Sequence, residues 1–183
     1  MAGLAKAGIG LASKRIIPKV PLWILLVAAY AIDVIWGIFF FAGIERLPEP
    51  NSVTTSPRSH GIFMAVIWSL LTGGISGLIS RNRRASLIIG LLVISHWVVD
   101  FISHPMTAMF PDDTGLSLLF DGSPIVGLGV WSTQLGVNIG EYGTLILGFV
   151  IYIFTLRKLR EVKEAMNREL HKHLFYPTPG SGR

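Results

Sequence analysis

Cysteine is absent from the sequence, and its absence excludes three kinds of site. Disulfide bonds, cysteine-ligated zinc and thiol nucleophiles all require this side chain. Charged residues are also scarce, at 15% of 183, whereas hydrophobic residues reach 51% and the mean hydropathy is +0.57. Soluble domains carry about 25% charged residues. The composition therefore excludes an ordinary soluble domain and predicts an integral membrane protein.

Four apolar stretches are long enough to cross the ~30 Å hydrocarbon core of a bilayer. They are residues 22–44, 61–79, 85–102 and 135–156. The predicted fold class is an all-α membrane protein, a bundle of about four transmembrane helices that occupies residues 22–156.

The segments outside these spans are polar or rich in turn-forming residues. Residues 1–21 form a basic leader, which we expect to be either a helix lying on the membrane surface or disordered. Residues 103–134 are long for a connection and predict a functional cap, or a partly re-entrant loop, on the outer side. Residues 157–183 predict a charged cytoplasmic helix followed by a frayed tail.

The 16 lysines and arginines are distributed unevenly around the spans. Four lie in the leader, three in the loop between the second and third spans and seven after the last span, against two in the other loops. The positive-inside rule then places both termini and the short basic loop in the cytoplasm. Because topology accounts for the net charge of +5, we expect membrane lipids as partners and no nucleic acid.

The stretch SHWVVDFISH, residues 95–104, places three ionisable side chains inside an apolar run. His96, Asp100 and His104 are four residues apart, so they fall along one face of a helix. Ionisable groups in membrane spans are rare and usually face a bundle interior, a partner or a water-filled cavity. A functional site along this face is therefore our default interpretation.

The predicted topology brings ionisable residues of the other spans to a similar depth. Asp33 lies near the middle of the first span and Glu141 about two turns below the outer surface. Glu45 and His60 lie at the outer mouth of the bundle. The carboxylates of Asp33, Asp100 and Glu141 would cost on the order of 8–10 kcal/mol if they were unpaired and ionised. Since the predicted spans contain no lysine or arginine, we expect protonation, a histidine cation or a bound metal ion to offset this cost.

Histidine and aspartate suit zinc, and also manganese or iron. The primary ligands that we expect for a divalent ion, zinc first, are Asp33, His60, His96 and Asp100. His104 lies ~12 Å along the helix axis from His96, too far to share the same ion easily. We therefore expect His104, Glu45 and Glu141 to orient the ligands, to act as a general base or to form part of a second metal site.

Each of these residues also has a simpler interpretation. Asp33 alone is compatible with an interhelical hydrogen bond, and His104 with a cap at the end of its helix. Glu45 is compatible with a solvated rim charge paired to a nearby arginine. Asp112 and Asp113 are most typical of turn residues. The convergence of several such residues supports a site more strongly than any one of them.

Four motifs follow one another along the spans: DVIWGIFFFAGIE, then SHG, then SHWVVDFISHPM, then GVW before the last, Glu-bearing helix. Together they resemble a bacterial family of LexA-binding, inner-membrane-associated, metal-dependent hydrolases, over about residues 22–156. The resemblance implies a polytopic protein of the bacterial cytoplasmic membrane with hydrolase activity. Three positions depart from the family pattern: Gly61 replaces a serine, Val130 a leucine and Ser132 an asparagine. The polar positions that the resemblance implies are Asp33, Glu45, His60, His96, Asp100, His104 and Glu141.

Three functions are compatible with this sequence. The first is a metal-dependent hydrolase acting on a lipid-like ester or phosphoester at the outer leaflet, with Glu141 or His104 moving the proton. The second is a non-catalytic subunit of a larger membrane complex, or of a homo-oligomer, in which the cluster holds a structural metal or a partner. The third is an ion or proton transporter, although the inner halves of the spans lack polar residues for a path. We favour the hydrolase.

Overall fold

The computed structural model describes residues 3–46, 56–120 and 122–175, and for residues 172–175 it gives the backbone alone. Helices dominate this part of the chain, and the strands β1 (Leu116–Ser117) and β2 (Ile125–Val126) form one short antiparallel pair. Three helical segments are long and apolar enough to cross a membrane, and a bent helix pair makes a possible fourth. An all-helical fold with three to four helices long and apolar enough to span a membrane is therefore confirmed. The three long segments are α5 (Ile62–Ser80), α6 (Arg83–Ser103) and Gln134–His171.

The first predicted span is broken in its middle. The helices α2 (Leu22–Ala29) and α3 (Ala31–Phe41) meet at an angle of 62°, because Tyr30 leaves the helical conformation with φ −101° and ψ 6°. A break of this kind releases backbone carbonyl groups at the end of the first helix, and these groups need partners inside an apolar bundle. The continuous span expected for residues 22–44 is thus replaced by two helices, and their junction lies beside the candidate site described below.

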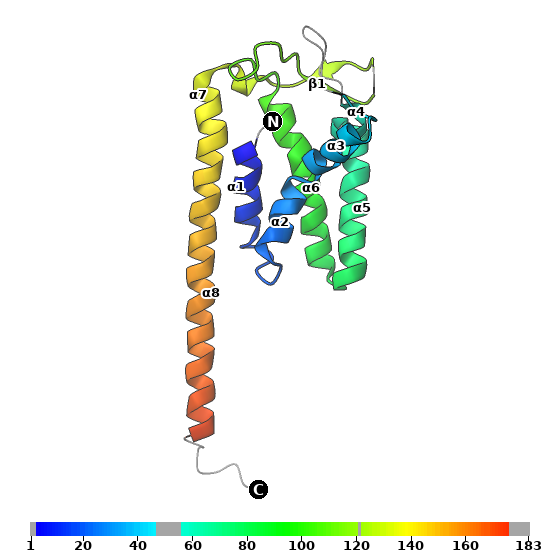
Figure 1. The fold of residues 1–183 in the computed structure, drawn as a ribbon. Coiled ribbons are helices and arrows are strands. Elements are labelled where there is room, and N and C mark those ends of the chain that lie inside the picture. Colours follow the sequence, from blue (N-terminus) through cyan, green and yellow to red (C-terminus); the bar gives the residue numbers. More distant parts are fainter. Residues whose placement is uncertain (1–2, 47–55, 121, 176–183) are drawn as a thin grey trace.

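The leader contains the helix α1 (Gly3–Ser13), which packs inside the bundle between α8 (Thr144–Phe175) and α2 (Figure 1). Close approach to α8 depends on two glycines: a Cβ on Gly8 would overlap the backbone at Thr144, and one on Gly148 would overlap the backbone of Gly8. Small residues at helix contacts are typical of membrane bundles. The leader was expected on the membrane surface or disordered, whereas α1 is a buried element, with the Lys6 side chain 1% exposed.

The helices α5 and α6 form an antiparallel hairpin that is stabilised by hydrogen bonds from serine hydroxyls. The Ser69 hydroxyl donates to Gly90 O at 2.7 Å, and the Ser86 hydroxyl donates to Gly73 O at 2.6 Å. At the turn between the helices, the Asn82 side chain caps α6 by accepting a hydrogen bond from the Ala85 backbone N–H. This rigid pair fixes the position of His96 and Asp100 on α6.

The long outer loop folds into a cap over the end of the bundle at which α6 ends (Figure 1). It carries the β1–β2 pair and the short helix η1 (Val130–Ser132), and it leads through α7 (Gln134–Val137) and the π-helical segment η2 (Asn138–Gly143) into α8. The cap contacts the short helix α4 (Pro57–His60) through β1, and at the start of α5, two residues after α4, Ile62 N donates to Leu118 O at 2.9 Å. The loop thereby helps to position the end of α4.

The two described ends of the chain lie toward opposite ends of the bundle. The start of α1 lies near the end where α6 stops and α8 begins, whereas α8 runs past the other helices in the opposite direction (Figure 1). A hydrogen bond from Ala5 N to Glu141 Oε2, 2.8 Å long, holds the start of α1 at that level. The placement of both termini on the cytoplasmic side stays a prediction.

Candidate metal centre

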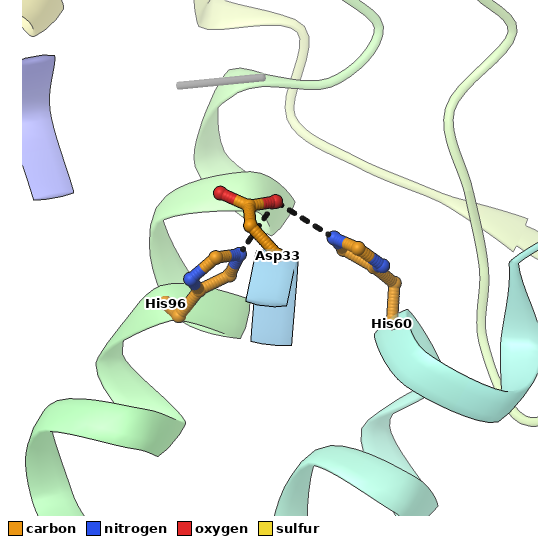
Figure 2. Close-up of side chains that lie close together, drawn as sticks. All are labelled: Asp33, His60 and His96. Atoms are coloured by element: carbon orange, nitrogen blue, oxygen red, sulfur yellow. Dashed lines mark hydrogen bonds and ion pairs between the residues drawn. The ribbon is translucent and has the colours of Figure 1, made fainter. Parts of the chain in front are cut away.

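Three of the four predicted ligands meet at one point in the bundle. Asp33 Oδ1 lies 3.3 Å from His60 Nε2 and 3.5 Å from His96 Nε2, and the three ligand atoms all lie within 4.8 Å of one another (Figure 2). Asp33 comes from the first turn of α3, His60 from the end of α4 and His96 from the middle of α6. Residues far apart in the sequence therefore present one carboxylate oxygen and two imidazole nitrogens to a common space.

Asp100 completes this group from the next turn of α6. Its Oδ2 atom lies 3.2 Å from His96 Nε2 and 3.8 Å from His60 Nε2, and the residue is 1% exposed. The i, i+4 spacing of His96 and Asp100 thus produces the contact that the sequence predicted. All four expected primary ligands lie together.

The His96 ring is held in one orientation by the broken helix. Its Nδ1 atom lies 2.9 Å from Ala29 O, a carbonyl released at the α2–α3 break. A carbonyl can only accept, so Nδ1 carries the proton and donates it, and in the neutral ring Nε2 keeps a free lone pair. Metal-binding histidines commonly have this arrangement, in which the far nitrogen is fixed by a carbonyl or carboxylate.

The His60 ring is oriented by a relay through Ser59 to Glu45. Ser59 Oγ donates to Glu45 Oε2 at 2.7 Å and lies 2.8 Å from His60 Nδ1, so it accepts the Nδ1 proton and leaves the Nε2 lone pair free. The Ser59 backbone N–H also donates to Glu45 Oε1 at 3.0 Å. Burial lowers the pKa of His60 below its ordinary value, which favours the neutral, ligand-competent ring. Glu45 is 3% exposed and is therefore not the solvated rim charge considered above.

Lys6 enters the site from α1, and it was not among the predicted site residues. Its Nζ lies 3.2 Å from Asp33 Oδ2, 2.9 Å from Asp100 Oδ1 and 2.6 Å from His96 Nε2. The expectation that no lysine or arginine reaches the carboxylates is therefore wrong. The available signal was the run of small residues around Lys6, including Ala5 and Gly8, which is typical of a helix packed inside a bundle.

The charges of this cluster do not balance. With neutral imidazoles, the carboxylates of Asp33 and Asp100 contribute two negative charges and Lys6 one positive charge, which leaves one negative charge buried. Asp100 Oδ1 is within ion-pair distance of Lys6 but receives no hydrogen bond of good geometry. Lys6 Nζ donates to the Nε2 lone pair of His96, but the Nε2 lone pair of His60 faces Asp33 Oδ1 at 3.3 Å, an arrangement that is repulsive unless a positive charge lies between them. The donor set therefore fits an additional cation.

Glu141 lies on η2 and binds the helix α1, not the cluster around Asp33. Its Oε2 accepts the hydrogen bond from Ala5 N, at the N-terminal turn of α1, where a negative charge is favourable to the helix dipole. The Tyr30 hydroxyl donates to Gly3 O on the same turn. Glu141 thus holds α1, and with it Lys6, from a position outside the four-ligand group.

His104 ends α6 and belongs to the cap. Its Nδ1 lies 2.8 Å from Asp113 Oδ2, and Asp113 also accepts hydrogen bonds from the backbone N–H groups of Met106 and Gly115. Burial alone would raise the pKa of Asp113, but the His104 contact and the two N–H donors hold it below its usual range. The turn interpretation of Asp113 therefore holds for its bond to Gly115, and its pairing with His104 is an addition.

No family model, curated protein or solved structure matches this chain in the comparisons that we made. The resemblance to a hydrolase family through short motifs therefore remains a prediction.

Proposed function

We propose that the protein is a membrane-embedded, metal-dependent hydrolase of the bacterial cytoplasmic membrane. One observation carries the proposal: two histidines, each with Nδ1 fixed by a partner, bring Nε2 atoms that are free of a ring proton within 4.8 Å of each other and of the same carboxylate oxygen. The divalent ion, zinc first and manganese or iron as alternatives, would be held by Asp33, His60, His96 and Asp100. An ion held there would polarise a substrate oxygen and lower the pKa of a water molecule, which could then lose its proton and attack an ester.

The other buried groups have roles that follow from their contacts. Glu45, acting through Ser59, orients His60 and increases its basicity. Lys6 binds the carboxylate oxygens that face away from the histidines, namely Asp33 Oδ2 and Asp100 Oδ1. For an ion to reach His96 Nε2, the Lys6 ammonium must give up its 2.6 Å contact with that nitrogen, while both carboxylate contacts can remain.

The surroundings favour an amphiphilic substrate. Helices long and apolar enough for a membrane carry or flank the site, so a reacting group must reach it from the lipid or through the cap. We therefore propose a lipid-like ester or phosphoester as substrate. A phosphoester is favoured by the ammonium of Lys6, which offers a second positive charge beside the ion.

Elemental mass spectrometry of the detergent-purified protein tests this function directly. We expect about one transition-metal ion per chain, lost in the His96→Ala, Asp100→Ala double variant, and hydrolysis of lipid esters or phosphoesters by the metal-loaded protein alone. A folded sample that takes up no metal after supplementation would contradict the proposal. So would turnover that survives in the double variant.

A second candidate function is favoured by Lys6. Because its ammonium already pairs with both carboxylates, the cluster can also act as a metal-free polar core that fixes α1 within a non-catalytic subunit of a membrane complex. In that case the purified protein contains no metal, and fixed protein partners co-purify with it at unit stoichiometry. The metal measurement therefore separates the two candidates.

A further inference from the structure

An open groove lies between α1, α6 and α8, beside the candidate metal centre. Its volume is about 410 Å³, within the range of ~300–1,000 Å³ that is typical of small-molecule pockets. Ile9 and Ala12 line it from α1, Ile88 and Leu91 from α6, and Ile151 from α8. Three helices that are distant in the sequence thus form one groove with mainly aliphatic walls.

The walls of this groove offer a ligand almost nothing to hydrogen-bond. Two serines line it, but both hydroxyls are already used within their own helices: Ser13 Oγ donates to Gly10 O at 2.6 Å, and Ser95 Oγ donates to Leu92 O at 2.7 Å. A polar ligand would lose its hydration there without compensation. The groove therefore suits a hydrocarbon chain.

Arg15 is the exception, because it adds a charge to the lining. It is exposed, it follows the last turn of α1, and no carboxylate pairs with its guanidinium among the residues that the structure describes. The end of α1 and the basic turn between α5 and α6 point toward the same end of the bundle (Figure 1). At that end, a membrane-spanning protein faces the headgroups of one leaflet.

We propose that the groove binds an acyl chain of an anionic phospholipid, whose phosphate pairs with Arg15. From Ile88 to Ser95 the groove follows α6 for about 10 Å, compared with ~15 Å for half of a bilayer core. A chain of that leaflet therefore fills it from the headgroup level toward the middle of the membrane. The bound lipid supports α1, which carries Lys6, and this site stands whether or not the protein is a hydrolase.

Native mass spectrometry of the full-length protein in detergent provides the test, with phosphatidylglycerol and phosphatidylcholine of identical chains as probes. We expect one phosphatidylglycerol per chain, held roughly fivefold more tightly than phosphatidylcholine. Arg15→Gln should remove this preference. Lys19→Gln is the matched control, because Lys19 is an exposed cation of the same turn that does not line the groove, and it should keep the preference.

Variants that fill the groove test the position of the acyl chain. Ala12→Phe fills it from α1 and Leu91→Trp from α6, and each should abolish retention of both lipids while the protein stays monodisperse with its metal content unchanged. The second variant serves if the first fails to fold. Equal binding of the two lipids by the wild-type protein, equal losses in Arg15→Gln and Lys19→Gln, or retention in a folded groove-filling variant would each overturn the proposal.

Discussion

Two histidine–aspartate groups lie on or beside α6 in this protein, and they differ in what surrounds the carboxylates. In the cap, Asp113 lies within ion-pair distance of His104 and accepts hydrogen bonds from two backbone N–H groups, so its oxygens are largely used. In the bundle, Asp33 and Asp100 face two imidazole lone pairs and share a single ammonium. The first group is a closed structural pair, whereas the second retains a net negative charge and an Nε2 lone pair on His60 that faces a carboxylate. The same residue types therefore support different functions according to their hydrogen-bond partners.

The sharpest test of this difference is to remove one histidine from each group. His96→Ala should abolish measurable metal binding, an effect of at least ~100-fold, because loss of a direct ligand exceeds the 10- to 100-fold effect of an outer-shell partner. His104→Ala should leave metal content unchanged and lower thermal stability only slightly. Metal titration of the two purified variants measures both effects, and equal losses of metal in the two would remove the distinction.

A second test removes the cation from the bundle group. Lys6→Met should destabilise the metal-free protein by about 3–5 kcal/mol, because it leaves two buried carboxylates without their partner. A divalent ion should restore more stability in this variant than in the wild type, since it no longer competes with the ammonium for His96 Nε2. Thermal unfolding with and without zinc measures this. Lys19→Met is the matched control. A similar loss of stability in this variant would contradict the assignment of Lys6 as the partner of the two carboxylates.

The sequence was sufficient to predict the four-ligand group because its members occur in unusual positions. His96 and Asp100 lie one turn apart within an apolar run, and depth along the spans brought Asp33 and His60 to them. Lys6 could not be found in this way, because its depth depends on how α1 packs against Gly148 on a distant helix. The carbonyl of Ala29 was equally hidden, since it becomes available only where Tyr30 interrupts the first span. The types and spacing of side chains can be read from a sequence. The position of a helix break and the packing of α1 inside the bundle depend on the tertiary structure.

A third test weakens the bundle group without removing a ligand. Ser59→Ala interrupts the relay from Glu45 to His60 and frees the ring to turn. We expect metal affinity to fall by about 10- to 100-fold, with the protein still folded. Ser56→Ala is a suitable control from the same segment, because the Ser56 hydroxyl binds the Trp36 indole and not the histidine. Metal affinities of the two variants, measured in parallel, would show whether the relay orients His60 for metal binding. An unchanged affinity in Ser59→Ala would exclude the relay.

The smallest expected effect concerns the closed pair in the cap. Because the pKa of Asp113 is lower in the folded protein than in the unfolded chain, the ionised carboxylate stabilises the fold above the unfolded value of ~3.9. This contribution is lost as the pH falls through the lower, folded value. Asp113→Asn should therefore cost on the order of 1 kcal/mol at pH 7, after allowance for solvent screening, and the difference from wild type should vanish in strong acid.

Thermal unfolding of Asp113→Asn between pH 7 and pH 2–3 provides the measurement, with the exposed neighbour in Asp112→Asn as control. Metal content at pH 7 should be the same in both variants and in the wild type, since Asp113 pairs with His104 outside the four-ligand group. A loss of metal in Asp113→Asn would show that the cap and the bundle group are coupled. In that case the cap would be a working part of the metal centre, because its strand β1 also contacts the α4 helix that carries His60.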